Sequence, residues 1–537
     1  MSLTAEMRAL CRPFWNEFAA REPVARLWRR DHTLWKPDPR EVSDRLGWLD
    51  LPFTMRYAAA ELEHFAGLAR QRDFRDAVLL GMGGSSLSAE VLRLAFPARQ
   101  GFPTLHVLDS TVPAAVDRVT RAMDPSRTLF LVSSKSGGTV EVMSLYRYFR
   151  ELVRKARGAE AGDNFVAITD AGTSLEKLAS AERFWRTFLN PADVGGRYSA
   201  LSYFGLVPAA LIGMDIGELL VCARDMARLC GIEAPFEDNP GAWLGFVAGC
   251  LARSGRDKLT IITSPLLSGF GLWAEQLVAE STGKEARGIV PIAQEPFGPP
   301  NTYGQDRFFV YLRLHGDDNA SCDRHVQSLS EAAFPNLVAD LKDPYDLAGT
   351  FFRWEFAVAL AGACLDINPF DQPNVEESKQ NTRRALEGYE KSGSLPMLED
   401  QGSFAELLQS AQEGDYLAIM VFADETPELR SELMALRRQL LMARHMPTTL
   451  GYGPRFLHST GQLHKGGADN GLFVQITCES QMEIPIPGAP YGFGVLASAQ
   501  AIGDFEALRG RKRRAIRVHV RKGEDIVQRV RALLQMV

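Results

Sequence analysis

Short apolar runs alternate with longer segments of helical length from about residue 51 onward, and this alternation most constrains the fold. The runs 77–81, 103–109, 128–136 and 164–170 have the length and apolar character of strands, whereas 139–156 is long enough for a helix. A strand that returns to a parallel neighbour through a helix forms a right-handed βαβ unit. The sequence therefore predicts an α/β fold with doubly wound, mostly parallel sheets covered by helices on both faces.

The alternation recurs along the chain and divides it into units. We expect a helical leader over 1–50, α/β domains over 51–244 and 245–395, and a smaller C-terminal α/β module over 396–537. Both larger domains contain a strand, a Gly/Ser-containing loop and a helix in that order, which suggests that they share one topology. The Gly- and Ser-containing segment 391–416 predicts the linker to the last module.

Composition argues against several classes of partner. A net charge of −6 over 537 residues gives no overall reason to expect nucleic acid or an anionic membrane. The most apolar stretch, near residue 203, contains Pro208 and is too short to span a bilayer. The basic run 509–523 alternates charges with Ile516 and Val518, which favours a solvated edge strand over a nucleic-acid patch.

Cysteine usage and the first residues bear on the compartment. The seven cysteines are scattered and form no C-x-x-C pair, which is typical of free thiols in a reducing compartment. The first residues, MSLTAEMRALCRPF, lack an apolar core of signal-peptide length. We therefore expect a cytoplasmic protein.

Two Gly/Ser-rich loops follow predicted strands and precede predicted helices. The first reads GMGGSS at 81–86 and the second reads SSKSGGT at 133–139. Exposed amides, hydroxyls and a lysine at the start of a helix suit a phosphate group. Neither loop has the spacing of a P-loop or of a dinucleotide fingerprint. Together they predict a phosphorylated ligand bound beyond the carboxyl ends of two strands of one sheet.

These loops resemble the phosphate-binding segments of sugar isomerase (SIS) domains in the phosphoglucose isomerase family. The resemblance continues, in the family's order, through GGRYSALSYFGLVPAAL at 195–211, AESTGK at 279–284 and NPFDQPNVEESK at 368–379. It implies two SIS-type domains, a small sugar phosphate as ligand, and no cofactor or metal. The likeness is greatest to the isomerase half of fused transaldolase–phosphoglucose isomerase proteins. It leaves a homodimer and a functional link to a transaldolase open as partners.

The resemblance also implies roles for individual residues. Aldose–ketose isomerisation needs one positioned base and a positive group near the developing oxyanion. Glu280 matches the base, and we expect burial to raise its pKa. Arg197 matches the group that holds the enediolate oxygen, Lys379 the lysine near the ring oxygen, and Glu141 a second carboxylate near the sugar. The matching phosphate-binding positions are Gly84, Ser85, Ser134, Lys135, Ser136, Thr139 and Gln372.

The histidine that opens the sugar ring departs from the family pattern. The family places it between the base and the lysine, where this chain has only His315 and His325, and Asp306 occupies the matching position. LHSTGQLHKGG at 457–467 instead resembles the family's histidine segment. We favour His458 as the acid–base group, with His464 as the competitor. The C-terminal module would then lend a loop to the active site of its own chain or of a dimer mate.

The resemblance therefore implies interconversion of glucose 6-phosphate and fructose 6-phosphate through an enediolate, as in glycolysis and gluconeogenesis. One alternative is an isomerase that also accepts mannose 6-phosphate. Another is a phosphosugar-binding SIS regulator without catalysis, which would need the hydroxyl loops but not a base, a cation and a ring-opening group together. An interaction module built on the basic C-terminal strand rests on composition alone.

Overall fold

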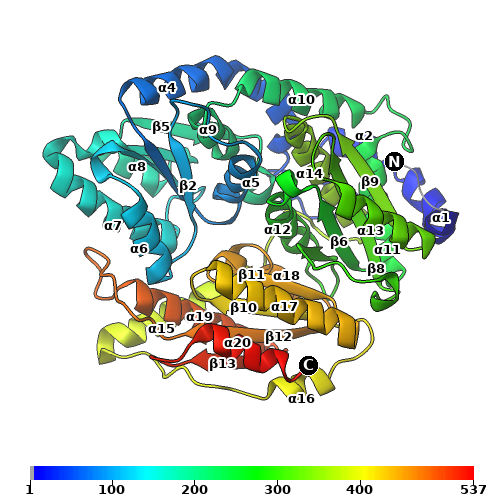
Figure 1. Cartoon of the computed structure of the whole chain (residues 1–537). Helices are drawn as coiled ribbons and strands as arrows, with labels where there is room; N and C mark the ends of the chain where they lie inside the picture. Colours follow the sequence, from blue (N-terminus) through cyan, green and yellow to red (C-terminus); the bar gives the residue numbers. More distant parts are fainter. Residues whose placement is uncertain (1–4) are drawn as a thin grey trace.

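The computed structural model describes residues 5–537 and contains three lobes, each built on one parallel sheet (Figure 1). The first two lobes lie side by side, and the C-terminal lobe lies across the lower side of both in this view. All strand pairs in the three sheets are parallel, which confirms the predicted α/β fold class. Across residues 5–537, we find no helix that combines the length and the apolar character required to cross a membrane.

The first sheet has the strand order β2-β1-β3-β4-β5. Its strands are β1 (Asp76–Leu80), β2 (Thr104–Leu108), β3 (Thr128–Ser133), β4 (Phe165–Asp170) and β5 (Arg186–Asn190). The connecting helices are α5 (Leu87–Ala95), α6 (Pro113–Ala122), α7 (Val140–Arg157) and α8 (Ser174–Ala181). Leu80 of β1 pairs with Val132 of β3, so the two Gly/Ser loops leave the same edge of the sheet as neighbours.

The helices before the first sheet pack on both larger lobes: the first two lie on the second lobe, and Phe65 of the last one packs against Trp185 and Phe188 of the first lobe. Helices α1 (Ala5–Ala20) and α2 (Pro23–Trp28) precede α3 (Leu51–Thr54) and α4 (Ala59–Gln71). Trp15 packs edge-on against Phe246 of α11 (Pro240–Arg253), and Trp28 stacks on Phe352 of α14 (Asp346–Cys364). Packing of these aromatic side chains attaches α1 and α2 to the helices of the second lobe.

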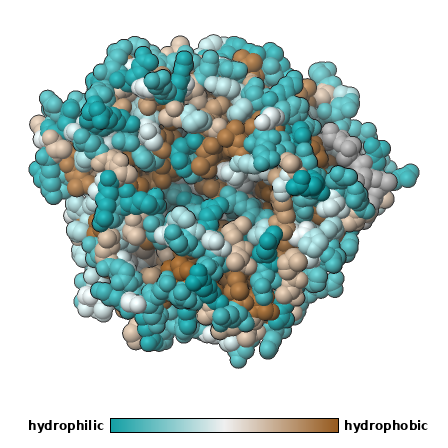
Figure 2. All heavy atoms as spheres, viewed as in Figure 1, coloured by the Kyte–Doolittle hydropathy of each residue, from teal (hydrophilic) through white to brown (hydrophobic). Residues whose placement is uncertain are grey.

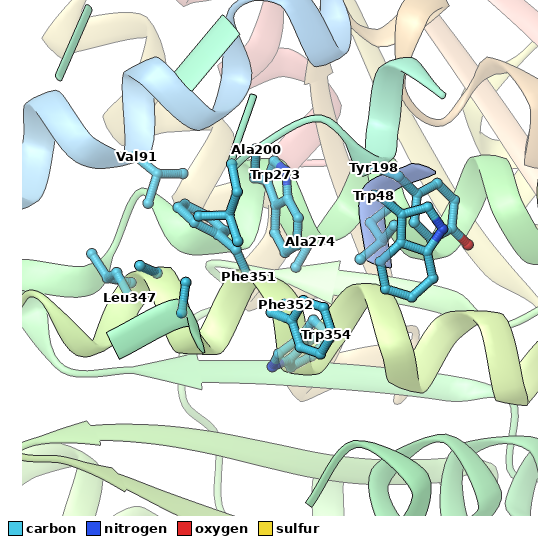
Figure 3. Packing of buried hydrophobic residues seen from close by; sticks show 14 of the residues in the cluster. Trp48, Val91, Tyr198, Ala200, Trp273, Ala274, Leu347, Phe351, Phe352 and Trp354 are labelled. Atoms are coloured by element: carbon cyan, nitrogen blue, oxygen red, sulfur yellow. The ribbon is translucent and has the colours of Figure 1, made fainter. Parts of the chain in front are cut away.

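The second sheet has the order β7-β6-β8-β9 and packs against a central helix. Its strands are β6 (Lys258–Thr263), β7 (Val290–Ala293), β8 (Arg307–Leu314) and β9 (Asn336–Leu341), and its other helices include α12 (Phe270–Thr282) and α13 (Ala320–Glu331). Every residue of α14 from Leu347 to Cys364 is buried. Helices α9 (Tyr203–Leu211) and α10 (Ile216–Leu229) join the first lobe to this helix. Figure 3 shows the aromatic packing there, including Trp273 against Phe351.

The third sheet has the order β11-β10-β12-β13. Its strands are β10 (Tyr416–Phe422), β11 (Thr448–Tyr452), β12 (Gly471–Cys478) and β13 (Arg514–Val520). Its helices are α16 (Phe404–Gln409), α17 (Pro427–Arg444), α18 (Gly461–Gly466), α19 (Phe493–Gly510) and α20 (Ile526–Leu534). Helix α15 (Val375–Ser392), which lies within the segment expected for the second domain, packs along α19 of this lobe.

The basic strand β13 lies at an edge of the third sheet, where it pairs with β12. The expectation that its charged side chains would be solvated is wrong for Arg517 and His519, which are both buried. Arg517 stacks on Phe505 of α19 and donates to Gln475, while His519 hydrogen-bonds to Thr477. Period-two alternation marks two faces of a strand, but neighbouring elements decide which faces are covered.

Candidate active site

A cleft of about 950 Å³ opens where the three lobes meet. Figure 2 shows the molecular surface recessed at this place, in the orientation of Figure 1. Eleven of the twelve predicted site residues line the cleft: Gly84, Ser85, Lys135, Ser136, Thr139, Glu141, Arg197, Glu280, Gln372, Lys379 and His458. Segments far apart in the sequence therefore converge on one concave site, as is usual for small-molecule binding.

The first Gly/Ser loop packs directly against the loop that carries Arg197. A Cβ atom added to Gly84 would lie 1.9 Å from the carbonyl oxygen of Gly196. Ser133 of the second loop donates its hydroxyl to the carbonyl of Ser85 at 2.8 Å. These contacts bring the amides of the first loop, the second loop and Arg197 to one wall of the cleft.

The second loop presents hydroxyls and a paired lysine. Ser136 and Thr139 line the cleft, and the hydroxyl of Ser134 lies 2.9 Å from that of Thr139. Ser134 is buried behind the wall, so it positions Thr139 instead of facing the cleft. Lys135 donates to Asp170, an acid at the end of β4 that the sequence did not single out. Burial raises the pKa of Asp170, and Lys135 opposes that rise.

The predicted base lies in the last turn of α12. Oε2 of Glu280 is 3.5 Å from Nη1 of Arg197, and both side chains are buried. Nε2 of Gln276, one helical turn earlier, donates to Glu280 at 3.2 Å. Burial raises the pKa of Glu280 despite the attraction of Arg197. A carboxylate tuned in this way can take a proton from a substrate and return it.

Arg197 is held by a set of hydrogen bonds that fixes its guanidinium. Nε donates to Ser281 at 2.8 Å, and Nη2 donates to the carbonyls of Pro369 (2.7 Å) and Asp371 (2.8 Å). Nη1 lies 3.4 Å from Oε1 of Gln372. A guanidinium with so many partners is pre-organised, so it can stabilise a developing oxyanion with little rearrangement.

His458 reaches the cleft from the C-terminal lobe of its own chain. Its Nε2 lies 2.8 Å from Oε1 of Glu141, and the amide of Gln500 donates to the same oxygen at 2.8 Å. Gln500 in turn accepts from Thr111 at 2.7 Å. Burial alone would raise the pKa of Glu141, but the charge of His458 and their hydrogen bond lower it. The geometry is that of a histidine oriented by a buried carboxylate.

The other candidate histidines lie elsewhere. His464 is buried in the C-terminal lobe beside Phe456 and Phe473, and neither ring nitrogen has a hydrogen-bond partner among residues 5–537. Burial lowers its pKa well below the ordinary range. His325 stacks on Phe297, and His315 is exposed near Asp340. None of the three lines the cleft.

Lys379 and Gln372 are exposed residues that line the cleft. Lys379 lies on the second turn of α15, and both side chains are exposed. Because the side chain of Lys379 is exposed, it can adjust to a bound ligand. Both residues line the same cleft as the two Gly/Ser loops.

Sequence reasoning missed three polar residues of this site. Gln276 donates both to Glu280 and to the carbonyl of His458 (2.7 Å), so it links the second and third lobes. Its spacing of four residues before Glu280, on the same face of one helix, is a signal that could have found it. Asp170 and Gln500 carry no comparable local signal, because their partners lie on other elements.

Comparisons with known proteins agree on one family. Residues 58–323 match the sequence profile of the family described as phosphoglucose isomerase. A glucose-6-phosphate isomerase from Symbiobacterium thermophilum is 31% identical over 385 residues, which cover 62% of this chain and 85% of the relative. Another, from Carboxydothermus hydrogenoformans, is 28% identical over 408 residues, or 66% of this chain and 88% of the relative.

Two solved structures share the architecture. A hypothetical protein from Thermus thermophilus has a TM-score of 0.59 at 26% identity, covering 72% of this chain and 99% of that one. A glucose-6-phosphate isomerase from Chlamydia trachomatis has a TM-score of 0.61 at 19% identity, covering 72% of this chain and 86% of that one. At that lower identity the second likeness bears on the fold alone.

Proposed function

The chain belongs to the phosphoglucose isomerase family, and on that premise we propose that it interconverts glucose 6-phosphate and fructose 6-phosphate. The observation that carries the proposal is the buried pair of Glu280 and Arg197 at the wall of the cleft, with Nη1 and Oε2 3.5 Å apart. The reaction needs these two groups side by side, because a base removes a proton as negative charge develops on the neighbouring oxygen.

Glu280 is the proposed base of the isomerisation. It takes the proton from C2 of the open-chain aldose and returns it to C1, and the intermediate between the two transfers is an enediolate. The hydroxyl proton passes from O2 to O1 in the same interval, so that the product carries a C2 carbonyl and a C1 hydroxyl. Arg197, held by Ser281 and two carbonyl groups, stabilises the negative oxygen of that intermediate. The raised pKa of Glu280 suits both steps, since the group must accept a proton and then release it.

His458 and Lys379 are the proposed ring-opening groups. Opening the cyclic sugar removes a proton from the C1 hydroxyl and delivers one to the ring oxygen. His458, oriented by Glu141, is an imidazole that can accept and donate the proton of this step. Lys379 faces the same cleft and supplies a positive charge near the oxygens between which the proton moves.

The phosphate of the sugar is proposed to bind at the two Gly/Ser loops. Gly84, Ser85, Ser136 and Thr139 line one wall of the cleft, where α7 begins. Backbone amides, hydroxyls and a helix N-terminus together favour an anion. Lys135 adds a positive charge beside the loops, Ser134 orients Thr139, and Gln372 lines the cleft beside Arg197.

Specificity, compartment and partners remain predictions. Acceptance of mannose 6-phosphate depends on contacts around C2, and a sensor without catalysis would not need the Glu280–Arg197 pair. We place the enzyme in the cytoplasm, because all seven cysteines are free thiols. The homodimer and the link to a transaldolase stay predictions as well.

A coupled assay that supplies fructose 6-phosphate and detects glucose 6-phosphate tests the proposal. Glu280→Gln should lower kcat about 10²–10⁴-fold, because the amide cannot act as a base. Glu275→Gln is a matched control on the same helix, since Glu275 is also buried but does not line the cleft. Burial raises the pKa of Glu275 to about 8, so the neutral amide should be tolerated at pH 7.

The outcomes of this assay are distinct. A parent protein that binds the sugar phosphate without turning it over would favour the phosphosugar sensor. Equal losses in Glu280→Gln and Glu275→Gln would indicate damage to α12 and would remove Glu280 from the proposed role. Turnover of mannose 6-phosphate by the parent would establish the wider specificity.

A further inference from the structure

Lys284 is a buried lysine just behind the cleft, four residues after the proposed base. Its side chain is 1% exposed, and it does not line the cleft. Nζ donates to the carbonyl oxygen of Asp371 at 2.6 Å and pairs with Oδ1 of the same residue at 2.7 Å. A lysine buried this fully needs such partners, because an unpaired buried ammonium is costly.

The carbonyl of Asp371 is shared by two cations. It accepts from Nζ of Lys284 and from Nη2 of Arg197, whose distance to it is 2.8 Å. Arg197 also donates to Pro369, so Arg197 and Lys284 together hold the backbone segment 369–372. This segment leads through Gln372 into α15, which carries Lys379.

One positive and two negative side chains influence the ammonium of Lys284. The charged groups that influence it are Arg197 from the glycine loop, Asp371 from the segment before α15, and Glu280 from α12. Burial and the repulsion of Arg197 lower the pKa of Lys284 to about 8, against the attraction of Asp371 and Glu280. The ammonium is therefore lost within an ordinary assay range.

We propose that Lys284 is a positioning residue whose ammonium fixes the segment 369–372 and thereby holds Arg197 in place beside Glu280. The inference rests on the proposed function, because Arg197 is the group that stabilises the enediolate oxygen there. Lys284 touches no substrate in this arrangement. When its charge is removed, Asp371 loses its partner and the carbonyl that anchors Arg197 is free to move.

The proposal predicts how kcat depends on pH, because only the protonated form of Lys284 makes these contacts. The lysine is protonated below pH about 8 and becomes neutral as the pH rises through that value. The contacts of the Lys284 ammonium with Asp371 are therefore present at neutral pH and are lost on the alkaline side. We expect kcat of the parent to fall above pH about 8, with a smaller change in KM.

Asp371→Asn gives the sharpest test, because the amide has nearly the same shape and keeps the backbone acceptor. Removing the carboxylate removes an attraction that raises the pKa of Lys284. The alkaline fall in kcat should then move about one to three pH units lower, the range that one nearby opposite charge produces. An alkaline fall at the parent's pH in a folded Asp371→Asn protein would overturn the proposal.

Lys284→Met tests the same contact by removing the ammonium instead of the carboxylate. It should lower kcat about 10- to 100-fold at pH 7, as a misplaced catalytic group does, and should abolish the alkaline fall near pH 8. Lys258→Met is the matched control, because Lys258 is an equally buried lysine paired with Asp257 at 2.6 Å and does not line the cleft. It should keep the parent's pH profile.

The two proposals fail in different ways. A parent without isomerase activity would overturn the proposed function, and with it this role for Lys284. An active parent together with a folded Lys284→Met protein that keeps the parent's kcat and pH profile would overturn the role of Lys284 alone. If Lys284→Met does not fold, the pH at which kcat falls in Asp371→Asn tests the role of Lys284 instead.

Discussion

Single residues in the cleft are oriented by partners from other elements. Glu141 is buried on α7, and it accepts both from the ring of His458 and from Gln500. The carboxylate fixes which way the imidazole faces, since a charged hydrogen bond is stronger and more directional than a neutral one. Gln276 contributes in the same way, by donating to Glu280 and to the backbone of His458.

The assignment of His458 predicts a difference between two forms of substrate. His458→Ala should slow turnover of the cyclic sugar phosphate by about 10²–10⁴-fold, because it removes the acid–base group of ring opening. Turnover of an open-chain analogue should change far less. Glu141→Gln should give a smaller loss of the same kind, because the imidazole stays but loses its charged partner.

Steady-state kinetics on both forms measures this difference. Substrate that is mainly cyclic can be compared with an analogue that cannot close. Equal losses on the two forms in His458→Ala would assign His458 to the isomerisation step or to binding, and not to ring opening.

The loops that end β1 and β3 show how elements build a binding wall. The two strands are adjacent and in register, so their loops emerge together. Gly84 of the first loop lies against the backbone of Gly196, and no side chain fits between this loop and the 195–198 loop that carries Arg197. Glycine is needed at this position because two backbone segments approach closely, as happens where a loop surrounds a ligand.

Gly84→Ala should therefore push the loop after β1 away from the 195–198 loop. The added methyl group would lie 1.9 Å from a backbone oxygen that cannot rotate away. We expect a loss of about 1–3 kcal/mol in the free energy of unfolding and a raised KM for the sugar phosphate. Thermal unfolding and initial rates measure the two effects.

Gly67→Ala is a suitable comparison for this variant. Gly67 lies within α4, and nothing lies within 4 Å of an added Cβ. Alanine there should stabilise the helix by about 0.5–1 kcal/mol and leave KM unchanged. A parent-like KM in Gly84→Ala would show that the sugar phosphate does not use this wall.

The whole molecule places one reactive group from each lobe around the cleft. Arg197, Glu280 and His458 come from the first, second and third lobes. The third lobe is attached to the first through Arg455, whose guanidinium forms two hydrogen bonds with Asp109 at 2.7 and 2.9 Å. Asp109 is 3% exposed, so this pair is desolvated on one side.

The attachment predicts that the first and third lobes depend on each other. Arg455→Met should cost about 3–5 kcal/mol, because it leaves the buried charge of Asp109 without its partner. It should also lower kcat, since Arg455 lies in the same short 3-10 helix (Arg455–His458) as His458. Thermal unfolding and the coupled assay measure both.

Another ion pair between the same two lobes serves as the control. Arg118 pairs with Asp424 at 2.9 Å, but its side chain is 60% exposed. Arg118→Gln should cost less than about 1 kcal/mol, because solvent screens an exposed pair. If Arg455→Met is no more harmful than Arg118→Gln, the Asp109 contact does not hold the third lobe in place.

Local patterns in the sequence were sufficient to predict the fold class and the candidate residues of the site. Apolar runs alternating with helix-length segments predicted the parallel α/β fold, because strand and helix periods are properties of neighbouring residues. The two Gly/Ser loops follow strands of one sheet, so their convergence was also predictable. The family resemblance added Glu280, Arg197, Lys379 and His458 as a set, and the cleft contains all four.

Tertiary structure alone decided the partners of these residues. Glu141 meets His458 and Lys284 meets Asp371, although the two residues of each pair are far apart in the sequence. Such contacts depend on how lobes pack against one another, and no local periodicity encodes that arrangement. The sequence by itself determined which elements form and which residues are candidates for chemistry. Packing of the three lobes decided which charges are buried together, because burial removes the water that would otherwise screen them.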